Sequence, residues 1–126
     1  MELCVNREKL KIDMDRDKYS LLESANALYL LAARRARTLV GYLFAFVLPH
    51  FHYKSSGEVA LTDMYWVRPE ERNGIGRKLF DRFESDMRKR GTVVQLVTSC
   101  KVSHDHTRFF ELLGWQHTDN TLVRFL

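Results

Sequence analysis

The chain has 126 residues, a length that suits a single folded domain. Hydrophobic residues make up 45% and charged residues 29%, which is ordinary globular usage and excludes a disordered or collagen-like chain. Twenty Lys and Arg against sixteen Asp and Glu give a net charge of +4, which favours an anionic partner without identifying it.

The apolar runs, the N-terminus and the cysteines indicate the cellular compartment of such a domain. The longest apolar run, residues 42–49, is far shorter than the roughly 20 residues of a membrane helix. The N-terminus has no charged-then-apolar secretory pattern. The two cysteines, Cys4 and Cys100, are too few and too far apart for a disulfide framework or a cysteine-based zinc site. We therefore expect a reduced cytoplasmic protein.

Helices and strands alternate along the chain. In chain order we expect a helix (13–26), three strands (28–33, 38–47, 59–67), a helix (75–90), a strand (93–97), a helix (105–113) and a closing strand (121–126). The helix from Ile75 carries apolar residues at i, i+4 spacing and ends at Gly91. This order predicts an α/β fold with a right-handed β-α-β crossover.

The sharpest local signal is a glycine turn between the third strand and the second helix. Gly74 and Gly76 open this helix, so backbone N–H groups and the positive end of the helix dipole point at one place. Such a turn can hold a phosphate, and Arg72, Arg77 and Lys78 can add charge-assisted contacts. The alternative is a surface loop in which the glycines only form a turn. The spacing matches neither a Walker A loop nor a Rossmann fingerprint.

Three segments resemble a known family. They read Val67-x-Pro69-x-x-Arg72-Asn73-Gly74-Ile75-Gly76-x-x-Leu79, Phe109-Phe110-Glu111-Leu112-Leu113-Gly114-Trp115 and Pro49-His50-Phe51-His52-Tyr53-x-Ser55. The first two resemble motif A and the F-Y-E-x-L-G-F segment of the GNAT superfamily of N-acetyltransferases, and the third resembles the small phage-encoded members. The resemblance implies one GNAT-like domain over residues 1–126. Its mixed, mostly antiparallel sheet of about five to seven strands would splay between the third and fourth long strands.

The resemblance also implies a co-substrate, acetyl-CoA, and no metal. Its pyrophosphate would lie on the N–H groups of the glycine turn, and its pantetheine arm would pair with the end of the third strand. The residues that the resemblance places at this cofactor are Trp66, Val67, Arg72, Asn73, Gly74, Ile75, Gly76, Arg77, Lys78 and Ser103.

The sequence departs from the family pattern at two positions. The turn is one residue shorter than usual, and aligning the glycines puts Glu71 where the family holds Arg or Gln. An acid there would repel a pyrophosphate, so we expect Arg72 to face the phosphates. Phe110 stands where many members have a tyrosine general acid. Either another group protonates the CoA thiolate, or the thiolate leaves unaided.

An amine acceptor must lose a proton, so the site needs a base or a water relay. Asp63 interrupts an apolar strand, and the resemblance puts it where GNAT enzymes often hold an acid or histidine that faces the substrate. Strict alternation places Leu61, Asp63, Tyr65 and Val67 on one face of that strand. The alternative is an Asp63 that only hydrogen-bonds a neighbouring loop.

Other candidates lie in two loops and on the third strand. His52 is expected to assist the acid, and His50, Tyr53, Tyr65 and His104 are expected to bind substrate. The alternative for each histidine is an ordinary solvated loop residue. A zinc site is disfavoured, because no ligand spacing supports it.

The leading hypothesis is an N-acetyltransferase that moves acetyl from acetyl-CoA to a primary amine by direct attack in a ternary complex. The acceptor would be an amine-bearing small molecule or a protein lysine, without a membrane partner, and the scattered positive charge disfavours nucleic acid. The alternative is a catalytically inactive GNAT-like module that binds a host protein or nucleic acid. The edge of the closing strand, 121–126, can pair in a homodimer.

Overall fold

The computed structural model describes residues 10–126, so Cys4 lies outside the described part of the chain. The chain divides into two compact units. The larger unit comprises residues 15–98, and the smaller one comprises residues 99–126 together with residues 10–14 of the described chain.

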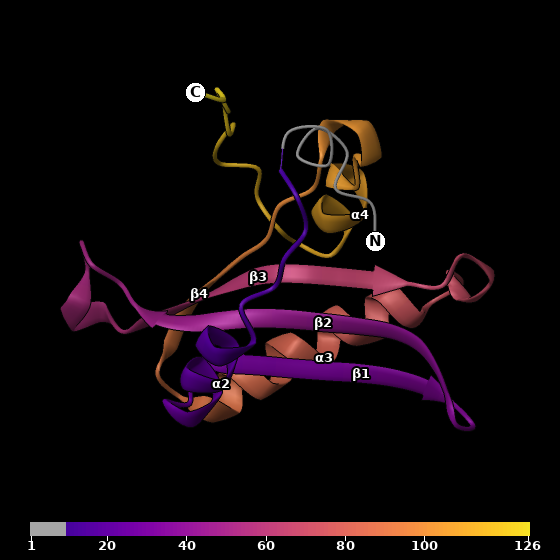
Figure 1. Ribbon diagram of the computed structural model, residues 1–126, viewed down its shortest axis with the longest axis horizontal. Coiled ribbons are helices and arrows are strands. Elements are labelled where there is room, and N and C mark those ends of the chain that lie inside the picture. Colours follow the sequence, from indigo (N-terminus) through magenta and orange to yellow (C-terminus); the bar gives the residue numbers. More distant parts are fainter. Residues whose placement is uncertain (1–9) are drawn as a thin grey trace. The chain divides into compact units, whose positions relative to one another are not determined.

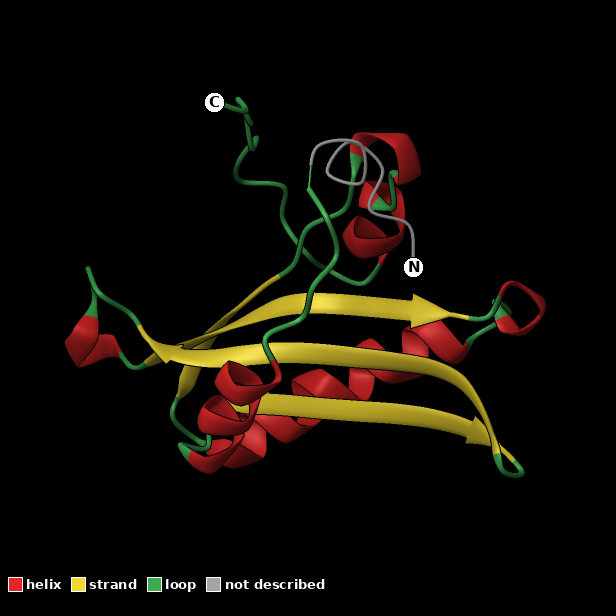
Figure 2. Ribbon diagram, viewed as in Figure 1, coloured by secondary structure: helices red, strands yellow, loops and turns green. Residues whose placement is uncertain are grey.

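The larger unit is a four-stranded sheet with a helix on each face. Its elements are α2 (Arg16–Ser24), β1 (Leu28–Arg35), β2 (Thr38–Pro49), η1 (Lys54–Ser56), β3 (Glu58–Val67), η2 (Pro69–Glu71), α3 (Ile75–Arg90) and β4 (Val93–Val97). The strands lie in the order β1-β2-β3-β4 (Figures 1 and 2). The first three are antiparallel, and β4 runs parallel to β3 after the α3 crossover. The predicted α/β order of this unit is confirmed.

The core lies between the sheet and α3. Alternate residues of β2, namely Leu43, Ala45 and Val47, are at most 2% exposed, as expected for the covered face of a strand. The buried residues of α3 are Leu79, Phe80, Phe83 and Met87. Burial of each large apolar side chain contributes about 1.5–3 kcal/mol, so this layer fixes α3 firmly against the strands.

Gly41 of β2 lets the start of α3 approach the sheet closely. A Cβ at this position would lie 3.3 Å from a methyl group of Leu79, 3.4 Å from one of Ile75 and 3.0 Å from the carbonyl oxygen of Trp66. A larger residue would therefore push the first turn of α3 away from β2 and β3. The place of the glycine turn depends on this contact.

The smaller unit contains η3 (Val102–His104) and α4 (Thr107–Leu112), within the predicted helix 105–113. The Asp105 carboxylate accepts a hydrogen bond from the Thr107 N–H at 2.9 Å, next to the start of α4. Phe110 is 5% exposed, and its ring contacts Phe109 and Trp115 at centroid distances of 5.2 and 5.5 Å. The segment that resembles F-Y-E-x-L-G-F thus forms the apolar centre of this unit.

Residues 121–126 form no strand, so the predicted closing strand is wrong. The described residues hold four strands, fewer than the five to seven expected. Strand-forming residues make a strand only where a neighbouring strand receives their backbone hydrogen bonds, and propensity does not supply that neighbour. The expected homodimer contact through this edge therefore lacks its strand.

Candidate functional site

Strands β3 and β4 separate partway along β3. Their parallel pairing ends with Leu61 opposite Val97. One residue further, the hydroxyl oxygens of Thr62 and Thr98 lie 2.8 Å apart and share a hydrogen bond. Beyond this fork β4 no longer pairs with β3, which continues to Val67. The strands part where the resemblance places the splay.

A β-bulge lies directly beside the fork. Met64 pairs with Phe44 on β2, but Thr62 pairs with Ala45, so Asp63 is the extra residue of β3. Bulges bend a strand and redirect its side chains. The acid that interrupts the apolar pattern in the sequence is thus also the residue at which the strand changes its register.

The bulge puts Asp63 and Tyr65 on opposite faces of the sheet. Tyr65 contacts Phe80 of α3 edge-on, with the ring centroids 5.2 Å apart. Asp63 instead reaches Tyr19 of α2, whose ring contacts Phe46 on the face away from α3. The predicted shared face is therefore wrong, because strict alternation does not hold across a bulge.

Asp63 is exposed, and helix α2 orients it. The phenol oxygen of Tyr19 donates a hydrogen bond of 2.7 Å to Oδ2 of Asp63. This bond, together with partial burial, raises the pKa of Tyr19 to about 12, so the phenol stays protonated and donates at neutral pH. Asp15 caps α2 by accepting from the Lys18 N–H at 3.0 Å. The partner of Asp63 is thus a helix side chain and not the neighbouring loop of the alternative reading.

The same sheet face carries an aromatic surface. The ring centroids of Tyr42 lie 5.4 Å from Phe44 and 5.7 Å from Trp66, and Tyr19 lies 6.0 Å from Phe46. We call these residues the aromatic face: Tyr19, Tyr42, Phe44, Phe46 and Trp66. All five are half-buried, and burial raises the pKa of Tyr42. No sequence pattern marked this face separately, because its β2 residues belong to a run that is typical of a mostly buried strand.

The other end of β3 leads into the predicted glycine turn. Gly74 is the N-cap of α3 at φ 124°, a backbone conformation that favours glycine, and no side chain of the described residues caps it. A Cβ at Gly74 would meet no atom of the described residues within 4 Å. Arg77 and Lys78 are exposed on the first turn, with Arg77 3.6 Å from Asp81. The amide groups at this helix start form a place for an anion.

Two side chains fix the connection from β3 to this turn. Arg72 donates from Nε to the Val67 carbonyl at 2.9 Å, so it folds back over the strand end. Glu71 binds Arg35 of β1 through contacts of 2.8, 3.0 and 3.1 Å. The hydrogen bonds from Arg35 lower the pKa of Glu71. Sequence reasoning missed Arg35, because no local pattern links two residues 36 positions apart.

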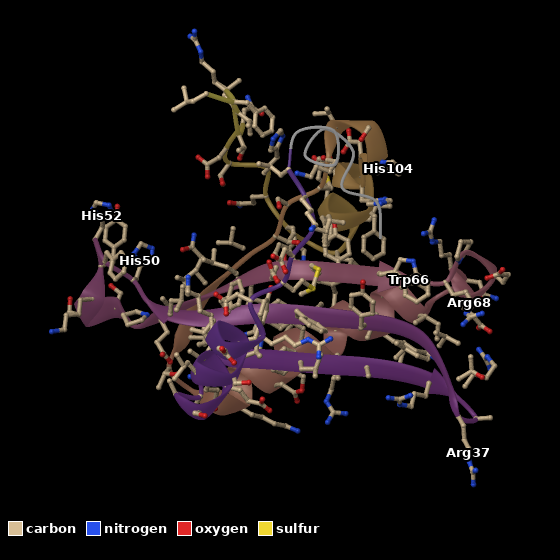
Figure 3. All side chains as sticks on the ribbon, in the orientation of Figure 1. Arg37, His50, His52, Trp66, Arg68 and His104 are labelled. Carbon is tan, nitrogen blue, oxygen red and sulfur yellow. The ribbon has the colours of Figure 1, made fainter. Side chains whose placement is uncertain are left out.

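The predicted histidine loop is not brought together with Asp63. His50 and Tyr53 contact each other edge-on at 4.7 Å, and His52 lies 6.3 Å from Tyr53. This loop precedes Glu58, the first residue of β3, and Figure 3 shows His50 and His52 at the end of the sheet away from Trp66 and Arg68. At about 3.4 Å per residue, Asp63 lies roughly 17 Å beyond the start of β3.

Ser103 and His104 belong to η3 of the smaller unit. The Ser103 hydroxyl lies 3.2 Å from Nδ1 of His104. Both side chains are exposed. The structure thus pairs these two predicted site residues with each other.

Among residues 10–126, no helix has the length and apolar character needed to cross a membrane. In the same part of the chain, no three His, Cys, Asp or Glu side chains gather into a group that could hold a metal ion.

The chain matches the acetyltransferase (GNAT) family over residues 3–115. This match spans most of the 126 residues, and the protein therefore belongs to the GNAT family of acetyltransferases. No curated protein matches the chain.

Solved structures share the fold. An aminoglycoside acetyltransferase from an uncultured soil metagenomic sample, in complex with trehalose, has a TM-score of 0.70 and 20% identity over 94% of this chain and 76% of its own. The ribosomal-protein-alanine N-acetyltransferase of Brucella melitensis has a TM-score of 0.66 and 23% identity over 89% and 82%. A predicted acetyltransferase from Clostridium acetobutylicum with acetyl-CoA has a TM-score of 0.69 and 18% identity over 94% and 80%.

The family uses acetyl-CoA, and the residues of the turn fit its phosphate end. The uncapped start of α3 offers N–H donors, and the open space at Gly74 allows a ligand to approach the backbone. Exposed Arg77 and Lys78 add positive charge at the same helix end. Glu71, the one acid that did not fit, is already paired with Arg35.

Proposed function

We propose that the protein is an acetyl-CoA-dependent N-acetyltransferase that acts on a primary amine by direct attack in a ternary complex. The observation that supports this most is the exposed Asp63 carboxylate, one residue from the fork at Thr62 and Thr98. A cationic amine held by this carboxylate would lie beside the distal half of β3, residues 62–67. That segment leads directly to the glycine turn.

The donor would lie along this segment and onto the helix. Acetyl-CoA supplies an acetyl group activated as a thioester. The N–H groups at the start of α3, with Arg77 and Lys78, would hold its pyrophosphate, and Ser103 remains a proposed contact. The backbone at Trp66 and Val67 would pair with the pantetheine arm, and a backbone N–H near the bulge would donate to the thioester oxygen. Residues 62–67 span roughly 17 Å at about 3.4 Å per residue, and the donor would have to extend along this length between the end of β3 and the fork.

Proton transfer is assigned to Asp63. A neutral amine is the nucleophile, so the carboxylate would take the ammonium proton directly or through water. Tyr19 would keep the carboxylate aimed at the acceptor side through its 2.7 Å hydrogen bond. Because His52 lies near the opposite end of β3, we replace it with Tyr19 as the partner of Asp63. His50 and Tyr53 then remain proposals for contacts with distant parts of a long acceptor, and His104 remains a proposed substrate contact.

The thiolate would leave without a protein acid at the usual tyrosine position. Phe110 is buried in the apolar centre of the smaller unit and has no proton to donate. A thiol has an ordinary pKa of about 8.5, so the thiolate is a tolerable leaving group near neutral pH.

The acceptor class follows from what shares the sheet face with Asp63. An amine at Asp63 places the body of the acceptor beside Tyr19 and Phe46, with Phe44 and Met64 as the next pair along the strands. Aromatic side chains stabilise apolar bodies by burial, and their ring faces attract ammonium groups. We therefore propose an aryl- or alkyl-bearing primary amine, in contrast to the polyhydroxylated aminoglycosides of the soil enzymes.

Two measurements test this function. Isothermal titration should show acetyl-CoA binding, and no binding at millimolar ligand would contradict the proposal. An acceptor panel, read by release of free CoA thiol, should give faster turnover with phenethylamine and hexylamine than with ethanolamine, an aminosugar or a lysine peptide. Binding without thiol release from any acceptor would instead favour the inactive binding module. Faster turnover with the polar amines would contradict the proposed acceptor class.

A further inference from the structure

The connection to the glycine turn contains Glu71 where the family resemblance leads one to expect Arg or Gln, and Arg35 of β1 is paired with this acid. Nε of Arg35 lies 3.0 and 3.1 Å from the two carboxylate oxygens of Glu71, and an Nη2 contact of 2.8 Å completes a forked ion pair. Two-pronged Arg–carboxylate contacts are among the stronger hydrogen bonds in proteins, and they fix geometry as well as charge.

Glu71 is less exposed than its neighbours Glu70 and Arg72. The Glu71 side chain is 19% exposed, whereas the Arg35 side chain is 65% exposed. The hydrogen bonds from Arg35, and the charges of Arg35 and Arg68, lower the pKa of Glu71 against the opposing effect of burial. Glu71 is therefore ionised at neutral pH and faces two cations. The adjacent acid, Glu70, is exposed and offers a matched comparison.

The position of Glu71 near the start of α3 is the reason why its ion pair with Arg35 matters for the anion site. Glu71 is the last residue of η2 and stands three residues before Gly74, the N-cap of α3. Helix N-termini attract carboxylates as well as phosphates, since both satisfy the same N–H groups and the same dipole. A Glu71 without Arg35 would add a negative charge near the anion site, and its side chain could occupy the amides itself.

We propose that Arg35 is a positioning residue for the acetyl-CoA site. By holding the Glu71 carboxylate against β1, it keeps the start of α3 available to the pyrophosphate and offsets a charge that would repel it. The inference rests on the proposed function, because it concerns the donor site of that same reaction. Arg35 itself does not contact the ligand in this assignment.

The test compares CoA binding by the full chain in six forms, measured by isothermal titration at low ionic strength. They are the wild type, Arg35→Gln, Glu71→Gln, the Arg35→Gln/Glu71→Gln double variant, and the controls Arg37→Gln and Glu70→Gln. Arg37 lies on the same hairpin as Arg35, and its replacement by Gln removes the same unit of positive charge. Thermal unfolding of each form reports whether it is folded.

Arg35→Gln should weaken CoA binding about tenfold, or about 1.4 kcal/mol, because the released Glu71 carboxylate would repel the pyrophosphate and compete for the same amides. Arg37→Gln and Glu70→Gln should stay within about twofold of the wild type, because both side chains are exposed and neither belongs to the Arg35–Glu71 ion pair. The double variant should bind like Glu71→Gln alone. In turnover assays Arg35→Gln should raise KM for acetyl-CoA and leave kcat unchanged, a split that general destabilisation would not produce.

The outcomes separate the two proposals. A wild type that does not bind CoA overturns the proposed function, and this inference falls with it. A wild type that binds while Arg35→Gln behaves like Arg37→Gln overturns the inference alone. A folded double variant that stays as weak as Arg35→Gln overturns the assigned role of Glu71. If Arg35→Gln does not fold, CoA binding by the double variant tests the inference, because the inference requires the double variant to bind CoA as Glu71→Gln does.

Discussion

The phenol of Tyr19 on α2 donates a 2.7 Å hydrogen bond to the Asp63 carboxylate at the bulge of β3, across 44 positions of sequence. The bond joins a helix with no buried residue to the strand that carries the candidate base. Since α2 has no buried residue, the bond from Tyr19 to Asp63 and the contact of the Tyr19 ring with Phe46 attach this helix to the sheet face.

Replacing Asp63 with Asn should slow turnover about 100-fold at saturating acetyl-CoA, because a positioned base contributes on the order of 10²–10⁴ to the rate. Affinity for CoA should stay within about twofold of the wild type, since Asp63 lies beyond the proposed phosphate contacts. Steady-state kinetics together with titration measure the two quantities. Glu84→Gln, which removes an exposed acid of α3 paired with Arg88, is the control. An unchanged kcat in Asp63→Asn would refute the assignment.

Tyr19→Phe should lower kcat several-fold, less than Asp63→Asn, because the carboxylate remains but loses its orienting donor. The decisive measurement is a double-mutant cycle. In the Asp63→Asn background, adding Tyr19→Phe should cause no further loss, since the interaction is already gone. Additive losses would show that Tyr19 acts independently of Asp63.

Gly74→Ala should weaken CoA binding and destabilise the fold by roughly 1–2 kcal/mol, the cost of holding a Cβ-bearing residue at a strained backbone angle. The strain would come from φ 124°, because a Cβ at this position meets no atom of the described residues within 4 Å. Gly91→Ala is a matched control, since Gly91 ends the same helix at φ 77°. It should cost a similar amount of stability and leave CoA affinity unchanged. Equal affinity losses in both variants would contradict a specific role for the turn.

Tyr29 should make the protein less stable at alkaline pH. Its pKa is raised by burial and by the 2.7 Å hydrogen bond that it donates to Asp86. The folded state therefore keeps this proton after the unfolded chain loses it, so the contribution is complete below about pH 10 and declines as the pH rises further. Urea unfolding between pH 8 and pH 11 should show a shallower decline in Tyr29→Phe. An unchanged slope would show that Tyr29 does not govern it.

Much of the fold could be predicted from local patterns. The helix from Ile75 has its apolar spacing within one stretch of chain, and Gly91 ends it as expected. The prediction of a closing strand was wrong because a strand does not depend on local pattern alone. Residues 121–126 have strand-forming side chains but form no strand. A strand needs a partner, and the partner is not written in the segment itself.

The candidate site divides in the same way. Asp63 stood out in the sequence as a charge within an apolar strand, but its face depended on a bulge set by pairing with β2. His52 was expected to assist Asp63 from the loop that leads into this strand, and the length of β3 keeps the two residues apart. No sequence pattern marked Arg35 as a site residue, because its proposed role depends entirely on its contact with Glu71.

The sequence by itself determined a small, mildly basic α/β chain, the glycine turn that opens α3, and the acid Asp63 that interrupts the apolar stretch of β3. Each of these depends on residues adjacent in the chain, where backbone freedom, helical spacing and charge act over a few positions. Only the tertiary structure decided that Asp63 faces Tyr19 and the aromatic face, and that Glu71 is neutralised by Arg35. These contacts join residues 44 and 36 positions apart, and strand register, which no local pattern encodes, brings them together.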